Sequence, residues 1–372
     1  MKPKTFTCCH CGGEFPTEQR TAFQGEDFCP DCLSDLTRVC SDCGTRFWTD
    51  NDMGYDDYPL CSHCYNQHYT TCDCCGSTIS LSNAYYEDDD EDQEYPLCLT
   101  CFRRRSNGKV IHDYHYRPDP IFYGEGPRWF GVELEMDGAG ESHYNAETLL
   151  STVNTDGEEL LYFKRDGSLN EGLEAVTHPM SLDFHMHDMP WQRLLEEAKR
   201  LGYCSHQTNT CGLHVHVSRD AFGETSAEQD AVIARILYFI EKHWAELLRF
   251  SRRTPRSLER WAARYGYKDQ PKDILDHAKK GPSGRYACLN LTNEDTIEFR
   301  IFRGTLKLNT LLATLQLVDR VCNVALCMSD DELKSMSWST FVTGCDQQEA
   351  LVQYLKERRL YVNEPIEAEA EV

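Results

Sequence analysis

The stretch "NTCGLHVHVS" (209–218) places two histidines two residues apart, behind a glycine. Side chains alternate between the two faces of a β-strand, so we expect His214 and His216 to share one face while their apolar neighbours pack on the other. Two imidazoles side by side on a sheet are candidate metal ligands. An isolated H-x-H pair more often consists of ordinary strand histidines held by hydrogen bonds. The interpretation therefore depends on what other strands bring to the same face.

A second candidate strand, "WFGVELEMDG", carries two carboxylates with the same alternation. Glu133 and Glu135 are expected on one face, with Val132, Leu134 and Met136 on the other. A solvent-exposed sheet face would show the same pattern, so this segment alone leaves both interpretations open.

Two further segments add acids and a guanidinium. In "RDGSLNEGLEAVTHP", Asp166 opens a turn, either as a plain turn residue or as a functional one, and Glu174 lies on a strand that a proline ends. "YACLNLTNEDTIEFRIFRGT" is typical of a hairpin that turns at "TNED" and returns with Glu298 and Arg300 on one face. Four strands would thus each place an acid, an imidazole or a guanidinium on one face.

Such a face could perform phosphoryl transfer. Clustered carboxylates suit hard divalent cations, magnesium above all, and arginine forms bidentate clamps on phosphate or carboxylate. Metal ions and arginine together stabilise the charge of a phosphoryl group in transit. The chain contains neither a Walker loop nor a G-x-G-x-x-G motif, so the sequence does not support a P-loop or Rossmann nucleotide site.

Long helices are expected between these strands. Apolar periodicity predicts helices at 189–202, at 226–250 with Ser226 as N-cap, at 306–328 as a buried helix, and at 346–360. Strands separated by such helices predict an α+β domain whose antiparallel sheet carries the site on its open face.

The N-terminal third repeats one cysteine pattern. Twelve of the 20 cysteines form six C-x-x-C pairs, which is metal-binding spacing, and the opening pairs recur every 32 residues: Cys8/Cys11, Cys29/Cys32, Cys40/Cys43, Cys61/Cys64, Cys72/Cys75 and Cys98/Cys101. We expect three tandem units within 1–102, each a knuckle, a short hairpin and a second knuckle that close a four-cysteine zinc site: about 5–35, 37–67 and 69–102. Units this small cannot build a core unaided, so three structural zinc ions would fold them.

The charge of the chain excludes some partners. Residues 1–102 hold 19 Asp and Glu against 5 Lys and Arg, and the whole chain carries a formal charge of −23. Nonspecific binding to nucleic acid or to an anionic membrane needs a basic surface. The run "EDDDEDQE" (87–94) is either a solvated hairpin tip or a docking site for a basic partner. Small exposed units suit protein contact or substrate presentation.

The rest of the chain divides by composition. Residues 103–128 shift to basic, proline, glycine and aromatic residues and are expected to be a linker that partly packs onto the next domain. That larger domain is expected at 129–362, with an acidic tail at 363–372. We find neither a run of 18 uncharged apolar residues nor a signal-peptide core, which leaves a cytoplasmic protein as the expectation.

Five short motifs occur in the order of a known family: "GVELE", "DGS", "EAVTHP", "GLHVHVS" and "LNLTNEDTIEFRIFRGT". Residues 129–328 resemble the amidoligase family, relatives of glutamine synthetase and glutamate-cysteine ligase that join a carboxylate to an amine at the expense of ATP. "GLHVHVS" looks like the Gly-x-His-x-His-x-Ser signature of the glutamine synthetase fold. The resemblance implies a glutamine synthetase-like antiparallel sheet with flanking helices.

The resemblance also implies a set of ligands for magnesium or manganese. Glu133 and Glu135 would hold different metal ions, Glu174 would join one of them, and His214 and Glu298 would complete the other. The zinc units fall outside the resemblance.

The remaining implied roles concern ATP and the substrates. His216 would contact the ATP phosphates, and Arg300 would clamp the transferring phosphoryl group or the acyl phosphate. Asp166 is the candidate for a second carboxylate that the family pairs with Glu174. Three further residues would contact phosphate or substrate: Arg285, Asn290 and Arg303.

The implied reaction has two steps: ATP phosphorylates a carboxylate to an acyl phosphate, and an amine then displaces phosphate to form an amide or isopeptide bond. Because the zinc units are acidic and lie beside the ligase-like domain in the sequence, we expect the substrate to be a peptide or protein, or the zinc units to bind a protein partner. Two alternatives stay open. A metal-dependent hydrolase would use the same acids and histidines to activate water without ATP, and a zinc-module adaptor would use the larger domain as a binding scaffold.

Overall fold

The computed structural model describes residues 4–55, 57–86, 94–106, 109–155, 157–281 and 284–361. It divides into two compact units, Met1–Gly108 with His115–Arg117 and Lys109–Tyr114 with Pro118–Val372. The acidic run at 87–94, except Glu94, and the acidic tail expected at 363–372 lie outside the described residues.

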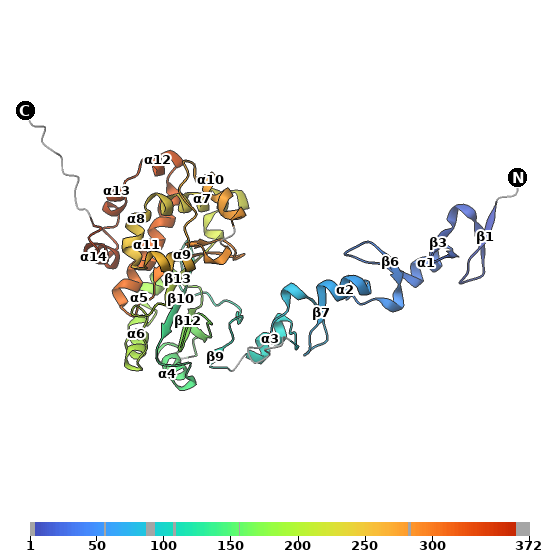
Figure 1. The fold of residues 1–372 in the computed structure, drawn as a ribbon, viewed down its shortest axis with the longest axis horizontal. Helices are drawn as coiled ribbons and strands as arrows, with labels where there is room; N and C mark the ends of the chain where they lie inside the picture. The colour runs from blue at the N-terminus through green and yellow to red at the C-terminus, as the bar shows by residue number, and fades with distance from the viewer. Residues whose placement is uncertain are drawn as a thin grey trace, which may run out of the picture. The chain divides into compact units, whose positions relative to one another are not determined.

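The smaller unit repeats one pattern three times (Figure 1). Each repeat starts with a hairpin: β1 (Thr5–Thr7) with β2 (Glu14–Pro16), β5 (Thr37–Val39) with β6 (Arg46–Trp48), and β7 (Tyr69–Thr71) with β8 (Thr78–Ser80). A 3-10 turn comes next: η1 (Thr17–Gln19), η2 (Thr49–Asn51) and η3 (Leu81–Asn83). Each repeat ends in a helix: α1 (Pro30–Leu36), α2 (Ser62–His68) and α3 (Leu99–Ser106). The first repeat has a second hairpin, β3 (Thr21–Phe23) with β4 (Glu26–Phe28).

The second cysteine pair of each repeat begins a helix, whereas a second knuckle was expected. Cys29 and Cys61 are the N-caps of α1 and α2, and Cys98 directly precedes α3. Residues three apart lie on the same side of a helix, so C-x-x-C at a helix start presents both thiols together. The spacing that predicted a knuckle is thus equally satisfied by a first helical turn.

The larger unit is built on a seven-stranded sheet of order β14-β15-β13-β10-β12-β11-β9. Neighbouring strands pair antiparallel except β9 with β11, which are parallel. The strands are β9 (Ile111–His112), β10 (Phe130–Asp137), β11 (Leu161–Lys164), β12 (Gly172–Thr177), β13 (Gly212–Ser218), β14 (Leu289–Asn290) and β15 (Thr296–Arg303). The expected α+β class with a mainly antiparallel sheet is confirmed.

The predicted strands are β10, β12, β13 and the β14–β15 hairpin. Two strands were not predicted, because both are short: β11, and β9 within the segment 103–128 that was expected to be a linker. Figure 1 shows β10, β12 and β13 side by side in the larger unit.

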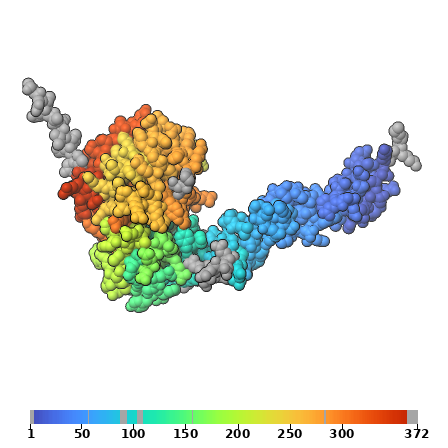
Figure 2. Space-filling model, in the orientation of Figure 1, coloured from blue at the N-terminus to red at the C-terminus, as the bar shows by residue number. Residues whose placement is uncertain are grey.

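One face of the sheet packs into the main hydrophobic core. Leu134 of β10, Val215 of β13 and Phe299 of β15 are buried there together with side chains of the helices. The helices are α4 (His143–Val153), α5 (Leu182–His187), α6 (Trp191–Arg200), α7 (Ser226–Lys242), α8 (Trp244–Ser251), α9 (Pro255–Trp261), α10 (Pro271–Lys280), α11 (Leu308–Cys327), α12 (Asp330–Ser335), α13 (Trp338–Thr343) and α14 (Glu349–Glu357), with the 3-10 turns η4 (Asp220–Phe222) and η5 (Gly284–Tyr286). In Figure 2, the green residues around α4 and α6 and the orange residues around α10 lie at opposite ends of the visible face of this unit.

The helix predictions hold at α6, α11 and α14, and the segment 226–250 needs two corrections. It forms two helices that meet at His243, whose buried ring packs against Phe239 and Trp338, a tertiary contact without a local sequence signal. The N-cap is Thr225 rather than Ser226, because Thr225 forms a reciprocal capping box with Glu228.

Among the described residues, α11 is the one helix with the length and apolar composition of a membrane span. It packs into the core of the larger unit, as the sequence predicted for this segment, with Leu311, Leu315 and Val318 fully or almost fully buried.

Candidate functional site

Glu133 lies between the two histidines of the opening motif. The register of β10 and β13 sets Glu133 opposite His214 and Gly131 opposite His216. One carboxylate oxygen of Glu133 is 3.1 Å from His214 Nδ1, and the other is 3.1 Å from His216 Nε2. Glu298 on β15 pairs with His216, and its Oε1 lies 3.5 Å from His214 Nδ1. Two carboxylates and two imidazoles from three adjacent strands therefore meet on the face opposite the core.

Two more carboxylates, Glu135 and Glu174, lie beside these side chains on the same face. We call the four glutamates and two histidines together the carboxylate and histidine cluster. Glu135 of β10 pairs with Glu174 of β12, and its Oε1 lies 3.8 Å from His214 Nε2. The backbone N–H of Gly212 donates a hydrogen bond to the other oxygen of Glu135. A Cβ on Gly212 would come within 2.5 Å of His214 Nε2, which explains why a glycine precedes the H-x-H motif.

The β14–β15 hairpin holds Glu298 from its other side. Asn290 Nδ2 donates to Glu298 Oε2 at 2.7 Å, and the Arg300 guanidinium donates to Glu298 Oε1. Asn290 is itself fixed, because its Oδ1 accepts from the backbone N–H of Thr292 at 2.9 Å. Glu298 is thus held in place by an amide and a guanidinium.

The site concentrates negative charge out of water. Burial, followed by the charge of Glu133, raises the pKa of Glu174 well above its usual range, and burial with the charge of Asp166 raises the pKa of Glu135. Burial would also raise the pKa of Glu133, but the opposing charge of His216 and hydrogen bonds from both histidines hold it well below its usual range. Carboxylates this close in a buried site are stabilised by a bound cation.

The donor atoms have the spacing that a cation site requires. Two groups, Glu133 with His216 and Glu298, and Glu133 with Glu174 and His214, each offer three atoms within 4.8 Å of one another. Ligands about 2.1 Å from a common magnesium ion lie no more than about 4.2 Å apart, so small side-chain shifts would complete either set. The residues present therefore fit one or two divalent cations, with Glu133 common to both groups.

Three other predicted residues lie at the edge of this cluster or beyond it. Asp166 is half-buried and accepts from the N–H of Ser168 at 2.6 Å, and its charge acts on Glu135 and Glu174. Arg285 is exposed and donates to the hydroxyls of two tyrosines, Tyr114 and Tyr286.

Arg303, the third of these residues, lies at the end of β15. Its guanidinium donates to the backbone carbonyls of Thr208 at 3.2 Å and of Arg252 at 3.4 Å.

Lys164 is a cation of the site that sequence reasoning missed. It pairs with Glu174 across β11 and β12, and its ammonium lies 3.6 Å from Glu174 Oε2 and over the ring of Tyr114. Its strand has four residues, too few for a periodicity argument. Its position two residues before Asp166 in "YFKRDGS" was the available signal.

Replacing Lys164 by Met should destabilise the larger unit by about 3 kcal/mol, because Glu174 would be left as a buried carboxylate without its cation. Chemical denaturation of the variant measures the loss. The double variant Lys164→Met, Glu174→Gln should recover most of that stability, since the charge that needs a partner is gone. Equal stabilities for the single and double variants would contradict a role for the ion pair.

The cysteines of the smaller unit form three groups of four. Within them, Sγ–Sγ distances are 4.0 Å for Cys11 and Cys29, 3.7 Å for Cys43 and Cys61, and 3.8 Å for the equivalent pair of the third repeat. A tetrahedron with Zn–S bonds of about 2.3 Å has S–S edges of about 3.8 Å. The described residues thus present three sites with the ligands and spacing of structural zinc, paired sequentially within each repeat.

The other cysteines do not offer an activated thiol in the core. Burial raises the pKa of Cys211 and Cys322 to about 12 and of Cys345 to about 11, and it also raises the pKa of Cys288. Thiols with raised pKa values are poor nucleophiles. These four cysteines therefore fit a structural role in the core.

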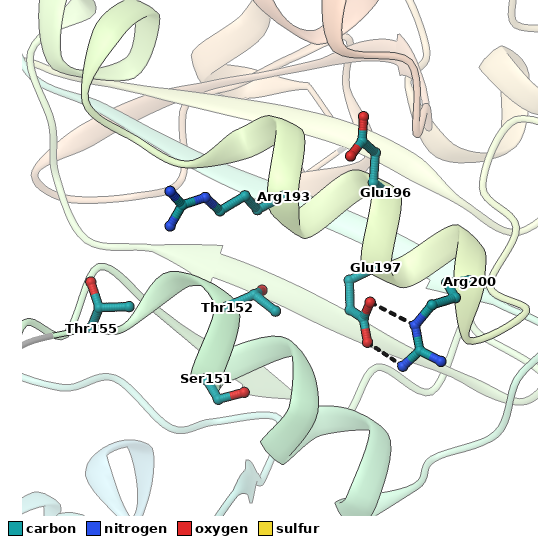
Figure 3. A pocket seen from close by; sticks show the side chains of 7 residues that line it. All are labelled: Ser151, Thr152, Thr155, Arg193, Glu196, Glu197 and Arg200. Carbon is teal, nitrogen blue, oxygen red and sulfur yellow. Dashed lines mark hydrogen bonds and ion pairs between the residues drawn. The ribbon is translucent and has the colours of Figure 1, made fainter.

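A separate groove of about 440 Å³ lies between α4 and α6 (Figure 3). Ser151, Thr152 and Thr155 line one side and Arg193 extends from the other, while Glu197 and Arg200 pair with each other. No residue of the carboxylate and histidine cluster lines it.

No protein-family model and no curated protein sequence matches the chain. Among solved structures, ligand-free GmaS matches with a TM-score of 0.36 and 13% identity over 69% of this chain and 68% of its own. A bifunctional glutathione synthetase from Pasteurella multocida matches with a TM-score of 0.31 and 14% identity over 62% of this chain and 46% of its own. The complex of the prokaryotic ubiquitin-like protein Pup with its ligase PafA matches with a TM-score of 0.26 and 10% identity over 65% and 59%. Matches at this level do not define a reaction, so the function rests on the side chains of this chain.

Proposed function

We propose that the larger unit is an ATP-dependent carboxylate–amine ligase. The observation that carries the proposal is the row of Glu133, Glu135, Glu174 and Glu298 with two histidines, to which Arg300 is attached through Glu298. Glu133 is half-buried, and the other three carboxylates are buried. Such a row binds divalent cations and places a guanidinium beside them, which is the combination that phosphoryl transfer requires.

The cations would be held by the groups that share Glu133. His216 and Glu298 complete one group, and Glu174 and His214 complete the other. Magnesium or manganese bound there would neutralise the phosphate oxygens of ATP.

The residues of the chain would act around the reacting atoms. A substrate carboxylate oxygen attacks the γ-phosphorus of ATP, ADP leaves, and the amine then attacks the acyl carbon so that phosphate leaves. Arg300, anchored by Glu298, would stabilise the charge on the transferring phosphoryl group. Asp166, half-buried at the edge of the cluster, would take the proton from the attacking amine. Asn290 would keep Glu298 oriented throughout.

The smaller unit would hold three structural zinc ions and bind a protein partner or a protein substrate. Its three four-cysteine groups support the metal, and its excess of acidic residues supports a basic surface on that partner. A pull-down with residues 1–108, loaded with zinc, tests the partner.

Phosphate release by the purified chain tests the ligase proposal. We expect release with ATP, magnesium, and pooled carboxylates and amines, and none when any of these is left out. The double variant Glu133→Ala, Glu298→Ala should be inactive, whereas Glu196→Gln, on the exposed side of α6, should match the wild type. Turnover without ATP would favour the hydrolase, and no turnover by the wild type under all conditions would favour the adaptor.

A further inference from the structure

Six arginines gather where α8, α14 and β15 end: Arg249, Arg252, Arg253, Arg303, Arg358 and Arg359. We call them the arginine strip. Figure 1 shows α8 and α14 next to each other, and the guanidinium of Arg358 donates to the carbonyl of Arg249 at 2.8 Å. The concentration is unusual because the whole chain carries a formal charge of −23.

The strip is held by backbone carbonyls rather than by acids. Arg249 donates to the carbonyl of Arg359 at 3.4 Å, and Arg303 to those of Thr208 and Arg252. Among the described residues, none of the six arginines forms an ion pair with Asp or Glu. Carbonyls at a helix end carry only about half a charge. The strip therefore keeps a net positive charge in the described chain, where the charge of Glu135 acts on Arg253 and that of Glu357 on Arg252 without a direct ion pair.

Two members of the strip adopt a backbone conformation that normally favours glycine. Arg252 has φ 59° and Arg359 has φ 55°, and both come after the last turn of a helix. Helices commonly end at glycine in this conformation, and a larger residue there costs about 1–2 kcal/mol. Capping alone would be served better by glycine, yet arginine occupies both positions.

The strip reaches the carboxylate and histidine cluster. Arg303 pairs with Gly212 in the sheet, two residues before His214 of the H-x-H motif. Arg253 is 7% exposed, and its guanidinium lies against the position that a Cβ on Gly212 would occupy, the same spot that His214 approaches. Burial lowers the pKa of Arg253 to about 10 although Glu135 opposes this. A buried guanidinium at the inner end of the strip thus lies beside the proposed metal ligands.

The outer end is open to water. Arg249, Arg252 and Arg359 are exposed, and Arg358 is half-buried. Arg303 contacts the carbonyl of Arg252, and Arg358 contacts that of Arg249, so these groups share one region. Burial, together with the charges of Arg252, Arg303 and Arg358, lowers the pKa of the nearby His206. The strip therefore runs from the cluster to the surface.

We propose that the arginine strip binds the side-chain carboxylates of an acidic peptide, which makes a Glu- or Asp-rich peptide segment the carboxylate substrate. The substrate assignment rests on the proposed ligase function, whereas the binding does not. Alternate side chains of an extended peptide repeat about every 6.6–7 Å, so successive carboxylates can meet arginines on separate elements. The exposed arginines of the strip, Arg249, Arg252 and Arg359, can each take a carboxylate in a bidentate pair.

Fluorescence anisotropy with labelled hexaglutamate, without ATP, tests the binding on the full zinc-loaded chain. We expect the double variant Arg252→Gln, Arg358→Gln to bind at least about tenfold more weakly than the wild type. The matched control Arg256→Gln, Arg260→Gln removes two exposed arginines of α9 and should leave the affinity unchanged. Equal binding of hexaglutamate and hexaglutamine, or equal losses in both double variants, would overturn the proposal.

Two further arms identify the source of the negative charge. Deleting residues 362–372, which include four glutamates, should leave hexaglutamate affinity unchanged; a tenfold gain would assign the strip to the chain's own terminus. Magnesium-ATP should not displace hexaglutamate; complete displacement would assign the strip to nucleotide phosphates. Either result would overturn the substrate assignment.

The outcome is distinguishable from that of the ligase test. Hexaglutamate binding without phosphate release would leave the strip established and the ligase wrong. If the chain released phosphate with short monocarboxylates but did not bind hexaglutamate, the ligase proposal would stand and the proposal for the strip would be wrong.

Discussion

Replacing Glu133 by Gln should lower the rate of ATP-dependent phosphate release by at least about 10³-fold. Glu133 alone belongs to both candidate cation groups, and its two oxygens lie 3.1 Å from one histidine each, His214 and His216. A neutral amide of the same shape keeps the packing but removes the charge that would hold a cation between β10 and β13. Single-turnover phosphate release and manganese binding, measured side by side, check both effects.

The matched control for this variant is Glu171→Gln, which removes a carboxylate from the loop before β12, outside both candidate cation groups. It should retain wild-type phosphate release and manganese binding. A Glu133→Gln variant that keeps its full rate would show that the row of carboxylates is structural, and the ligase proposal would then fail.

Replacing Cys61 by Ser should remove one of three zinc ions per chain and unfold the second repeat. Cys61 is at once a candidate zinc ligand and the N-cap of α2, and the small cluster around Leu60 and Phe47 cannot replace the metal. Structural zinc contributes about 10–16 kcal/mol in comparably small domains. Metal analysis and the amide dispersion of NMR spectra measure the two effects.

The exposed thiol of Cys9 provides the control, since it lies outside the four-cysteine groups. Cys9→Ser should keep three zinc ions and a folded unit. A wild-type chain with far fewer than three zinc ions, purified without chelators, would contradict the metal assignment for the whole repeat.

Local patterns predicted much of the site because each strand carries its own two-residue alternation. Glu133 with Glu135, His214 with His216, and Glu298 with Arg300 were each assigned to one face from sequence, and the structure places all six on the face opposite the core. Asp166, Arg285 and Arg303 lie on turns or strand ends, where alternation says nothing about direction. Their assigned roles stay predictions.

Other features depend on contacts between distant segments. Lys164 meets Glu174 because β11 pairs with β12, and no local pattern in four residues predicts that pairing. The arginine strip brings residues 249–253, 303 and 358–359 together from three elements. The break between α7 and α8 at His243 likewise depends on a distant contact, because the His243 ring packs against Trp338.

Residue spacing was sufficient to predict the fold class, the cysteine groups of each repeat, and which charged side chains share a face with the histidines. Backbone geometry converts spacing along the chain directly into side-chain direction, so these features need no knowledge of distant segments. The strand order, the cation beside Glu174 and the route of the arginine strip to the cluster became known only from three-dimensional contacts. Those depend on which strands and helices become neighbours, and burial of the apolar faces of the whole chain, rather than any local pattern, selects those neighbours.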